Sequence, residues 1–444
     1  MKFLSIVVSF LCVNSLMASE TYKAGVLLLQ NKEMNDFTPF IHNAGATGLD
    51  ILVLPPLEPT ENYDKAISVV SRAARQAGLY VVVHLYEKAR CQLAYELMRS
   101  NLVFDRTGAI VAVYRKAQNG AANCTTSDSK LVTFATDFGV TFGVLMEEDI
   151  VLYDEEHLKG VKNFVMTGDL QSEVPFLNAA QFAPSWTYTT NANLVSTAGI
   201  YSGKAGLKTG SDKLAVSELH KNGGNDAPVV PSVNPSSATF ARDLSQYVIK
   251  PLDLEASSRG YKETVCHRSF CCEFYIKSAD AVAKPELSYS LAAFNGIQPF
   301  IANHNIGTQT CVISGSEKSN VFFERISITA NFTKQNSQYP IVQSAAVLPT
   351  ENFKFQTNVN GIAHQVTLEI TEAQNVINFG IFGKDATDKL ENNYVFGEKN
   401  STESEQNEIY DYIFNEDVQE FFDYVWIRLR ILLVVVSIYI LEMM

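Results

Sequence analysis

The segment 65–84 reads Lys65-Ala-Ile-Ser-Val-Val-Ser-Arg-Ala-Ala-Arg-Gln-Ala-Gly78-Leu79-Tyr-Val-Val-Val-His84 and joins a helical pattern directly to a strand pattern. Its first part places four apolar residues on one helical face, namely Ile67, Val70, Ala74 and Ala77. Gly78 is the residue type at which helices commonly end, and the run from Leu79 to His84 is typical of a buried strand. A helix followed at once by a strand predicts a layered α/β domain.

The same alternation continues on both sides of this segment. Strands are expected at 22–29, 49–54, 131–134 and 140–145, and a hairpin at 102–104 and 110–114 around the turn 105–108. The last strand leads to the acidic triplet Glu147-Glu148-Asp149. Ligand chemistry in α/β folds sits where strands end and loops begin, so this triplet is a candidate site.

The second half of the chain has a different pattern. Residues 223–238 are rich in Gly, Pro, Asn and Ser and indicate a connector. Beyond it, strands are expected at 270–276, 287–293, 320–330, 364–370 and 376–382, with no helix of ordinary length. We therefore expect an α/β domain over 19–222, the connector over 223–238 and a β-rich domain over 239–397.

Both ends of the chain carry targeting patterns. Residues 1–18 contain Lys2 before an apolar stretch, which predicts a cleaved export signal. Residues 398–424 are acidic and indicate a solvated spacer. Residues 425–444 are apolar but contain Arg428 and Arg430, which favours a lipid-attachment signal over a permanent span. We expect anchoring at the outer face of the cell membrane, with release as a secreted protein as the alternative.

The net charge of the chain argues against one class of binding partner. The chain of 444 residues has 35 basic and 48 acidic side chains and a net charge of -13 at pH 7. No basic run is long enough to follow a phosphate backbone, so nucleic acid is not an expected partner. No cofactor is expected, and the sequence identifies no protein partner.

Six cysteines remain beyond the export signal: Cys91, Cys124, Cys266, Cys271, Cys272 and Cys311. An even number in an exported chain predicts disulfides, with Cys91 and Cys124 as one pair and at least one bond among the other four. A zinc site that includes His267 is the less favoured alternative, so no metal is expected. The sequons at Asn123, Asn331 and Asn400 predict N-linked glycans.

Several motifs together resemble the vanin and biotinidase family. Cys266-His-Arg-Ser-Phe-Cys271-Cys272-Glu-Phe-Tyr, followed by Leu291-Ala-Ala-Phe-Asn-Gly296, is similar to the second domain of those proteins. Ile51-Leu-Val-Leu-Pro55, the hairpin up to Lys116, and Phe134-Ala-Thr-Asp-Phe-Gly-Val-Thr-Phe-Gly143 resemble three segments of the first domain. The resemblance covers residues 22–397 in the same order. It implies a four-layer α-β-β-α, nitrilase-like carbon–nitrogen hydrolase domain followed by a β-rich domain.

The resemblance also implies an activity. Family members cleave linear amides such as pantetheine with a Glu, Lys and Cys triad, in which a thiolate attacks the carbonyl, a carboxylate moves the proton and an ammonium stabilises the oxyanion. Residue by residue, the lysine is Lys116, the general base is replaced by Pro56, and the nucleophile is replaced by Glu147. Glu58, two residues after Pro56, is a candidate substitute base.

Two functions follow from these replacements. The first is a pseudoenzyme retained for binding, with a small amide as candidate ligand. The second is an active amidohydrolase in which Glu58 or Glu147 activates a water molecule. Loss of the thiol and the base favours the first. We expect Glu147 to pair with Lys116 and the other two carboxylates to face solvent or to cap the next segment.

The acidic triplet and His84 each have more than one possible role. The acidic triplet could hold a divalent cation or form a glycosidase-like carboxylate pair, but adjacent strand residues point to opposite faces, which argues against both. His84 lies inside a predicted strand and is expected to be a core histidine with satisfied hydrogen bonds.

Overall fold

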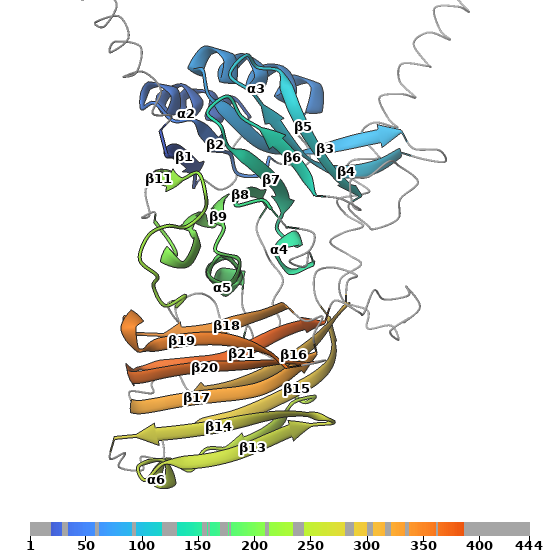
Figure 1. Ribbon diagram of the computed structural model, residues 1–444. Coiled ribbons are helices and arrows are strands. Elements are labelled where there is room, and N and C mark those ends of the chain that lie inside the picture. Colours follow the sequence, from blue (N-terminus) through green and yellow to red (C-terminus); the bar gives the residue numbers. More distant parts are fainter. Residues whose placement is uncertain are drawn as a thin grey trace, which may run out of the picture. The chain divides into compact units, whose positions relative to one another are not determined.

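The first half of the chain forms two mixed β-sheets (Figure 1). The first sheet has the order β11-β1-β2-β3-β4-β5, with β1 (Thr21–Leu27), β2 (Ile51–Val53), β3 (Tyr80–Arg90), β4 (Tyr95–Phe104), β5 (Ile110–Ala117) and β11 (Leu214–His220). The second sheet has the order β10-β9-β8-β7-β6, with β6 (Val132–Ala135), β7 (Thr141–Met146), β8 (Asn163–Thr167), β9 (Asn193–Ser196) and β10 (Gly199–Ser202).

Helices cover the outer face of each sheet. Helices α2 (Met34–Ala46) and α3 (Tyr63–Ala77) share a hydrophobic core with the first sheet. Helices α4 (Asp149–Leu152) and α5 (Ala179–Thr190) share another with the second sheet. A third core joins the facing sides of the two sheets and includes Tyr22, Val53, Val82, Phe142 and Val165. The α-β-β-α order of layers expected from the sequence is confirmed.

Helix α3 shows why the sequence predicts its bounds well. The Asn62 side chain accepts a hydrogen bond from the Lys65 amide at 2.9 Å, which satisfies one free donor of the first turn. Gly78 adopts φ 66°, and its amide donates to the Ala74 carbonyl at 2.8 Å. The chain then enters β3 at Tyr80, so the predicted helix-to-strand unit is confirmed.

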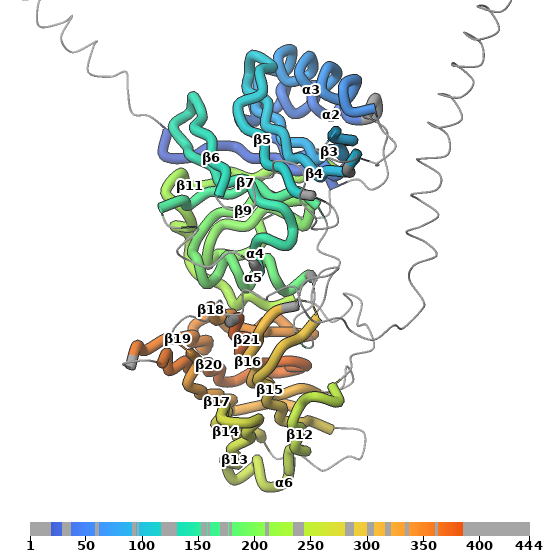
Figure 2. Tube along the Cα trace, turned by 90° about the vertical axis from the view of Figure 1, so that its right-hand side faces the viewer, coloured from blue at the N-terminus to red at the C-terminus, as the bar shows by residue number. Residues whose placement is uncertain are grey.

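The second half is an antiparallel β-sandwich (Figure 2). The third sheet has the order β12-β15-β16-β21-β18, with β12 (Val248–Pro251), β15 (Tyr289–Pro299), β16 (Asn305–Gly315), β18 (Ser337–Ser344) and β21 (Val376–Asp385). The fourth sheet has the order β13-β14-β17-β20-β19, with β13 (Tyr261–His267), β14 (Phe270–Ser278), β17 (Phe322–Thr333), β19 (Phe353–Asn360) and β20 (Ala363–Gln374). The β-rich second domain is confirmed. Its one short α-helix among the described residues is α6 (Leu254–Ser257).

Two disulfides occur in the sandwich. Cys272 on β14 is bonded to Cys311 on β16, and both are fully buried between the two sheets. Cys266 and Cys271 are bonded across the hairpin of β13 and β14, and both are exposed. The predicted bonding within this domain is confirmed, and the zinc alternative is wrong, because these sulfurs are not free thiolates.

Helix α5 packs on β18 and connects the two halves of the described chain. The Ser185 hydroxyl donates to the Pro340 carbonyl at 2.7 Å, and the Gln181 amide donates to the Pro231 carbonyl at 2.8 Å. Trp186 on α5 belongs to the same buried core as Phe382 on β21.

The computed structural model describes residues 19–28, 34–57, 62–90, 95–117, 131–152, 158, 160–168, 176, 179–208, 213–233, 244–279, 288–299, 305–315, 321–333, 337–360 and 363–385. All of them belong to one compact unit. The predicted export signal, acidic spacer and apolar tail, together with Cys91, Cys124, Asn123 and Asn400, lie outside the described residues. Within the described ranges, no helix is long and apolar enough to cross a membrane.

Candidate active-site cluster

Lys116 lies close to two of the three acidic residues that follow β7. Its Nζ is 3.2 Å from Glu148 Oε1 and 2.5 Å from Asp149 Oδ1. Lys116 is on β5 of the first sheet, while Glu148 is in the turn after β7 of the second, so the two sheets bring these charges together. All three residues are buried, with Asp149 fully inaccessible to solvent.

Glu147 has a different partner from the one we expected. Its Oε1 accepts a hydrogen bond from Arg99 Nη1 at 2.7 Å, and Arg99 Nη2 lies 2.5 Å from Glu148 Oε1. The expected pairing of Glu147 with Lys116 is therefore wrong. The reason is local: residues 147 and 148 form a turn, not a continuation of the strand. Strand alternation does not govern this triplet.

Asp149 fixes that turn. Its Oδ2 accepts a hydrogen bond from the Met146 amide at 2.7 Å, while Oδ1 faces Lys116. The carboxylate thus closes the end of β7 and begins α4. The expectation that the carboxylates beside Glu147 face solvent or cap the next segment is wrong, because Glu148 and Asp149 are both buried and ion-paired, and Asp149 accepts from the preceding Met146 amide.

Gly168 leaves room for the Glu147 carboxyl group. Gly168 follows β8 and has φ 91°, a conformation that glycine adopts without strain. A Cβ atom at this position would overlap Glu147 Oε2. Glu147 Oε2 and Arg99 Nε are both buried, and neither atom has a hydrogen-bond partner among the described residues.

The charges of the cluster do not balance when all groups are ionised, because three carboxyl groups face two cations. Burial raises the pKa of Glu147 to about 8, and the neighbouring Glu148 charge acts in the same direction. Burial alone would also raise the pKa of Glu148, but Lys116 and Arg99 outweigh it and lower that pKa to about 2. Burial also raises the pKa of Asp149, so protonation within the triplet is favoured at Glu147 and Asp149 and disfavoured at Glu148.

A hydrogen-bond network around His84 and Asn101 joins four strands beside the cluster. Its Nδ1 lies 2.8 Å from Asn101 Oδ1 and 3.2 Å from Thr167 Oγ1, and Asn101 Nδ2 donates to the Leu145 carbonyl at 2.8 Å. Burial lowers the pKa of His84 to about 4, so the ring is neutral. The expectation of a core histidine with satisfied hydrogen bonds is confirmed.

The structure describes only one of the two positions proposed for a base. Pro56 lies in the loop after β2, which the Leu57 amide holds against β3 by donating to the His84 carbonyl at 3.2 Å. The Pro56 side chain has no ionisable group. Glu58 lies outside the described residues.

Arg99 is the charged residue that sequence reasoning missed. We predicted a short hairpin, whereas β4 extends back to Tyr95 and pairs Arg99 with Lys116. A β-bulge between Val103 and Phe104 shifts the register of this pair of strands. Extending the predicted hairpin without that bulge would place Arg99 opposite Arg115. The bulge was not readable from the residue pattern.

A divalent cation in this cluster is not supported. Among the residues that the structure describes, no group of three His, Cys, Asp or Glu side chains is arranged to hold a metal ion. The carboxyl groups of the triplet instead form ion pairs with Arg99 and Lys116.

Comparisons with known proteins agree with this architecture of an α-β-β-α domain followed by an antiparallel β domain. Residues 238–389 match the family described as the Vanin C-terminal domain. Vanin-like protein 1 of Drosophila melanogaster is 28% identical over 426 residues, which cover 78% of this chain and 75% of the relative. Vanin-like protein 2 of the same organism is 26% identical over 479 residues, which cover 83% of this chain and 90% of the relative. Residues 238–389 therefore carry a vanin C-terminal domain, and the chain is similar to vanin-like proteins over most of its length.

Two solved structures also align with part of the chain. An amidase from Nesterenkonia sp. is 14% identical with a TM-score of 0.34, over 47% of this chain and 93% of the amidase. A carbon-nitrogen hydrolase from Helicobacter pylori G27 is 14% identical with a TM-score of 0.35, over 45% of this chain and 89% of that protein.

Proposed function

We propose that this vanin-like protein does not catalyse the amide hydrolysis implied by the family resemblance, and that it is retained for binding, with a small amide as candidate ligand. The observation that carries the proposal is the placement of Glu147. The resemblance puts this residue where a catalytic thiol is expected, and its carboxyl group is held by Arg99 over Gly168.

A carboxyl group in this position is a poor substitute for a thiolate. Attack on an amide carbonyl needs a strong nucleophile and a base that removes its proton. Glu147 is a weak nucleophile even when ionised, and Pro56 cannot act as a base. Loss of the nucleophile alone commonly lowers turnover on the order of a millionfold.

The charge on Lys116 also supports loss of catalysis. A lysine that stabilises an oxyanion must offer positive potential where negative charge develops. Lys116 is already paired with Glu148 and Asp149 in a buried setting. A developing oxyanion beside it would therefore meet two carboxyl groups together with the ammonium.

One observation favours the alternative of an active amidohydrolase. The raised pKa of Glu147, about 8, lies close to the pH at which a general acid or base works best. In that alternative Glu147 removes a proton from an attacking water molecule, and Lys116 stabilises the oxyanion.

The test is an assay of the purified protein on pantetheine and on biotin amides. We expect no turnover above the uncatalysed rate for the wild type and for Glu147→Gln. Hydrolysis by the wild type that Glu147→Gln abolishes would replace our proposal with the carboxylate mechanism. Hydrolysis that survives this substitution would show that neither reading of Glu147 is correct.

Binding is tested separately from turnover. We expect uncleaved pantetheine to raise the unfolding temperature of the wild type, because a ligand that binds only the folded state stabilises it. Lys116→Met, which keeps an unbranched side chain one atom shorter and removes its charge, should lose this effect if the ligand sits in the cluster. Absence of any shift at millimolar pantetheine would reject this ligand.

The two disulfides indicate an oxidising, secretory environment. We further propose that the apolar tail, residues 425–444, is a signal for lipid attachment at the outer cell surface. The resemblance of this tail to such a signal supports the proposal. Phosphatidylinositol-specific phospholipase C should release the protein from cells, and an epitope placed after Met444 should be absent from the mature form. Retention of both protein and epitope on treated cells would contradict it.

A further inference from the structure

The outward face of the fourth sheet contains a shallow polar groove. Strands β13, β14 and β17 supply its walls, and its volume is about 460 Å³, within the range of about 300 to 1,000 Å³ typical of small-molecule sites. Two rows of side chains line it across the strands: Lys262, Tyr275 and Ser327 form one, and Thr264, Glu273 and Thr329 form the other.

Asn331 continues the same face of β17. Side chains alternate along a strand, so Thr329, Asn331 and Thr333 point outward while Ala330 and Phe332 are buried in the core. Both residues that define the sequon, Asn331 and Thr333, are exposed. The middle residue, Phe332, is fully buried and holds this segment in the sandwich.

The exposed disulfide is the next neighbour of Asn331 across the sheet. Cys272 pairs with Ala330, which places the preceding Cys271 beside the following Asn331 on the outward face. Cys271 is bonded to Cys266 directly opposite on β13. Neighbouring strands lie about 4.8 Å apart, so a group attached to Asn331 reaches both the disulfide and the Thr329 end of the groove.

We propose that Asn331 carries an N-linked glycan whose first sugars lie over the Cys266–Cys271 disulfide and the adjoining groove. In the attachment, Asn331 Nδ2 loses a proton and bonds to C1 of the first N-acetylglucosamine of a lipid-linked oligosaccharide. The bond from C1 to the diphosphate oxygen breaks, and the lipid diphosphate leaves. The second-domain disulfides support passage through the oxidising compartment where this reaction occurs.

The chemistry of the groove suits its proposed occupant. Hydroxyl groups of Thr264, Ser327 and Thr329 can donate to and accept from sugar hydroxyls, and Tyr275 offers an aromatic ring. A glycan here has two consequences. It shields an exposed disulfide from external thiols, and it keeps large partners away from this face of the sandwich.

The experiment compares the reduction of the two second-domain disulfides in the folded, secreted protein. Peptide mass spectrometry first measures the glycan at Asn331, and then the rate at which a mild reductant opens Cys266–Cys271. The buried Cys272–Cys311 bond is the internal reference. We expect several-fold faster opening of Cys266–Cys271 in Thr333→Ala, which destroys the sequon, and the wild-type rate in Thr333→Ser, which keeps it.

Enzymatic removal of the glycan from the folded wild type gives a second measurement without any mutation. It should accelerate opening of Cys266–Cys271 and acetylation of Lys262 in the groove, while acetylation of exposed Lys65 on α3 stays constant. An unmodified Asn331 in the secreted protein overturns the proposal. Equal rates of disulfide opening with and without the glycan overturn it as well, because the sugars would then not lie over the bond.

Discussion

At the residue scale, the cluster around Glu147 shows that the ion pairs of a site depend on a few charged side chains from different strands. The sequence predicts that Lys116 and the acidic triplet lie near the ends of strands, and the structure places them there. It could not assign the partners, because they depend on the turn at 147–148 and on Arg99 from a strand whose length was underpredicted. Ion pairs between elements distant in sequence leave no periodic signal.

The proton on Glu147 makes stability depend on pH. Its pKa is raised to about 8 in the folded protein, above the ordinary value of 4.5 that applies when unfolded. Its contribution to stability is therefore fully present below about pH 4.5 and is lost as the pH rises through 8. Glu147→Gln removes this titration.

We expect the free energy of unfolding of Glu147→Gln to equal that of the wild type near pH 5 within about 1 kcal/mol and to exceed it at pH 8.5. Urea unfolding of both proteins at four pH values from 5 to 9 measures the difference. His84 and the charged groups outside the cluster are shared by both proteins and cancel in the comparison. Two parallel pH profiles would show that Glu147 is ionised throughout this range.

Gly168 gives a second test at the same scale. Gly168→Ala adds a Cβ atom to a residue with φ 91° and forces it against Glu147 Oε2. We expect a loss of about 1 to 3 kcal/mol in the free energy of unfolding. In the Glu147→Ala background the loss should be smaller, because the overlapping carboxyl group is gone. An identical loss in both backgrounds would mean that backbone strain alone explains the effect.

At the element scale, the predictable parts of the fold are those with strong periodicity or clear end signals. The segment from α3 to β3 has both. Helices α2 and α5 were missed, and each contains a proline, Pro39 and Pro184, a residue type that normally argues against a helix interior. In α5, tertiary packing of Trp186 against Phe164 and the sandwich overrides that local preference.

The turn between β4 and β5 depends on Arg106. Its Nη1 donates to the Gly78 carbonyl at 2.6 Å, Nη2 lies 2.7 Å from Asp50 Oδ1, and Nε lies 3.0 Å from Asp137 Oδ2. One side chain thus ties the hairpin turn to the end of α3, to the start of β2 and to the turn before β7. The guanidinium also lies over the rings of Tyr80 and Phe138.

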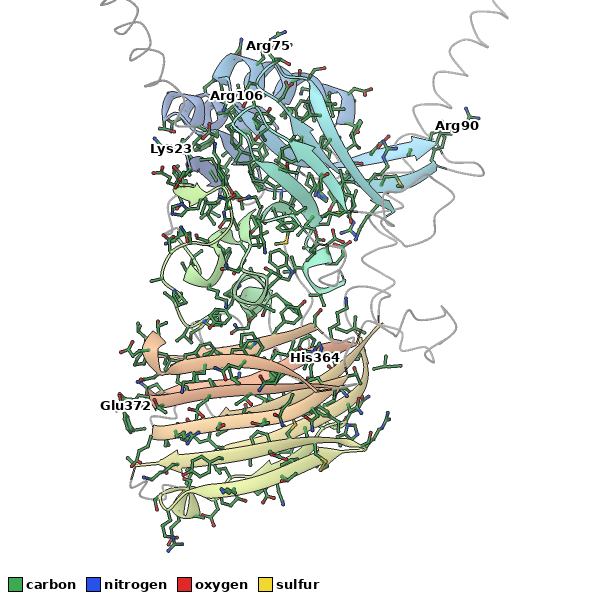
Figure 3. The ribbon with its side chains drawn as sticks, viewed as in Figure 1. Lys23, Arg75, Arg90, Arg106, His364 and Glu372 are labelled. Carbon is green, nitrogen blue, oxygen red and sulfur yellow. A yellow bond between two sulfur atoms is a disulfide. The ribbon has the colours of Figure 1, made fainter. Side chains whose placement is uncertain are left out.

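We expect Arg106→Ala to lower the free energy of unfolding by about 1 to 3 kcal/mol, since hydrogen bonds to a half-buried charged group are lost together. Arg75→Ala on the exposed side of α3 is the matched control and should change it by less than about 0.5 kcal/mol (Figure 3). Chemical denaturation followed by tryptophan fluorescence measures both. Equal effects of the two substitutions would show that the contacts of Arg106 contribute nothing beyond helix surface charge.

At the scale of the whole molecule, the division into an α/β half and a β half was readable from the change in pattern near residue 223, whereas the order of strands was not. Five sandwich strands, β12, β13, β16, β18 and β19, gave no signal strong enough to be predicted. Strand β18 is buried along its whole length because it lies under α5, so it lacks the alternation that marks a half-buried strand.

The two disulfides should contribute unequally to the stability of the sandwich. Cys272–Cys311 joins residues 39 apart and links the two sheets, whereas Cys266–Cys271 joins residues 5 apart within one hairpin. Closing the longer loop removes more entropy from the unfolded chain, which corresponds to about 4 kcal/mol against about 2 kcal/mol. Replacing Cys272 and Cys311 by alanine also leaves space between buried side chains, which adds to the loss.

We therefore expect the double substitution Cys272→Ala with Cys311→Ala to reduce amide protection in β14 and β16 far more than Cys266→Ala with Cys271→Ala. Hydrogen exchange is the suitable measurement because it reports the protection of each strand separately. The α/β half supplies the internal control, and β1 to β3 should keep their protection in both variants. If the hairpin bond proved the more important of the two, the sandwich would be held by local closure of β13 on β14 and not by the link between its sheets.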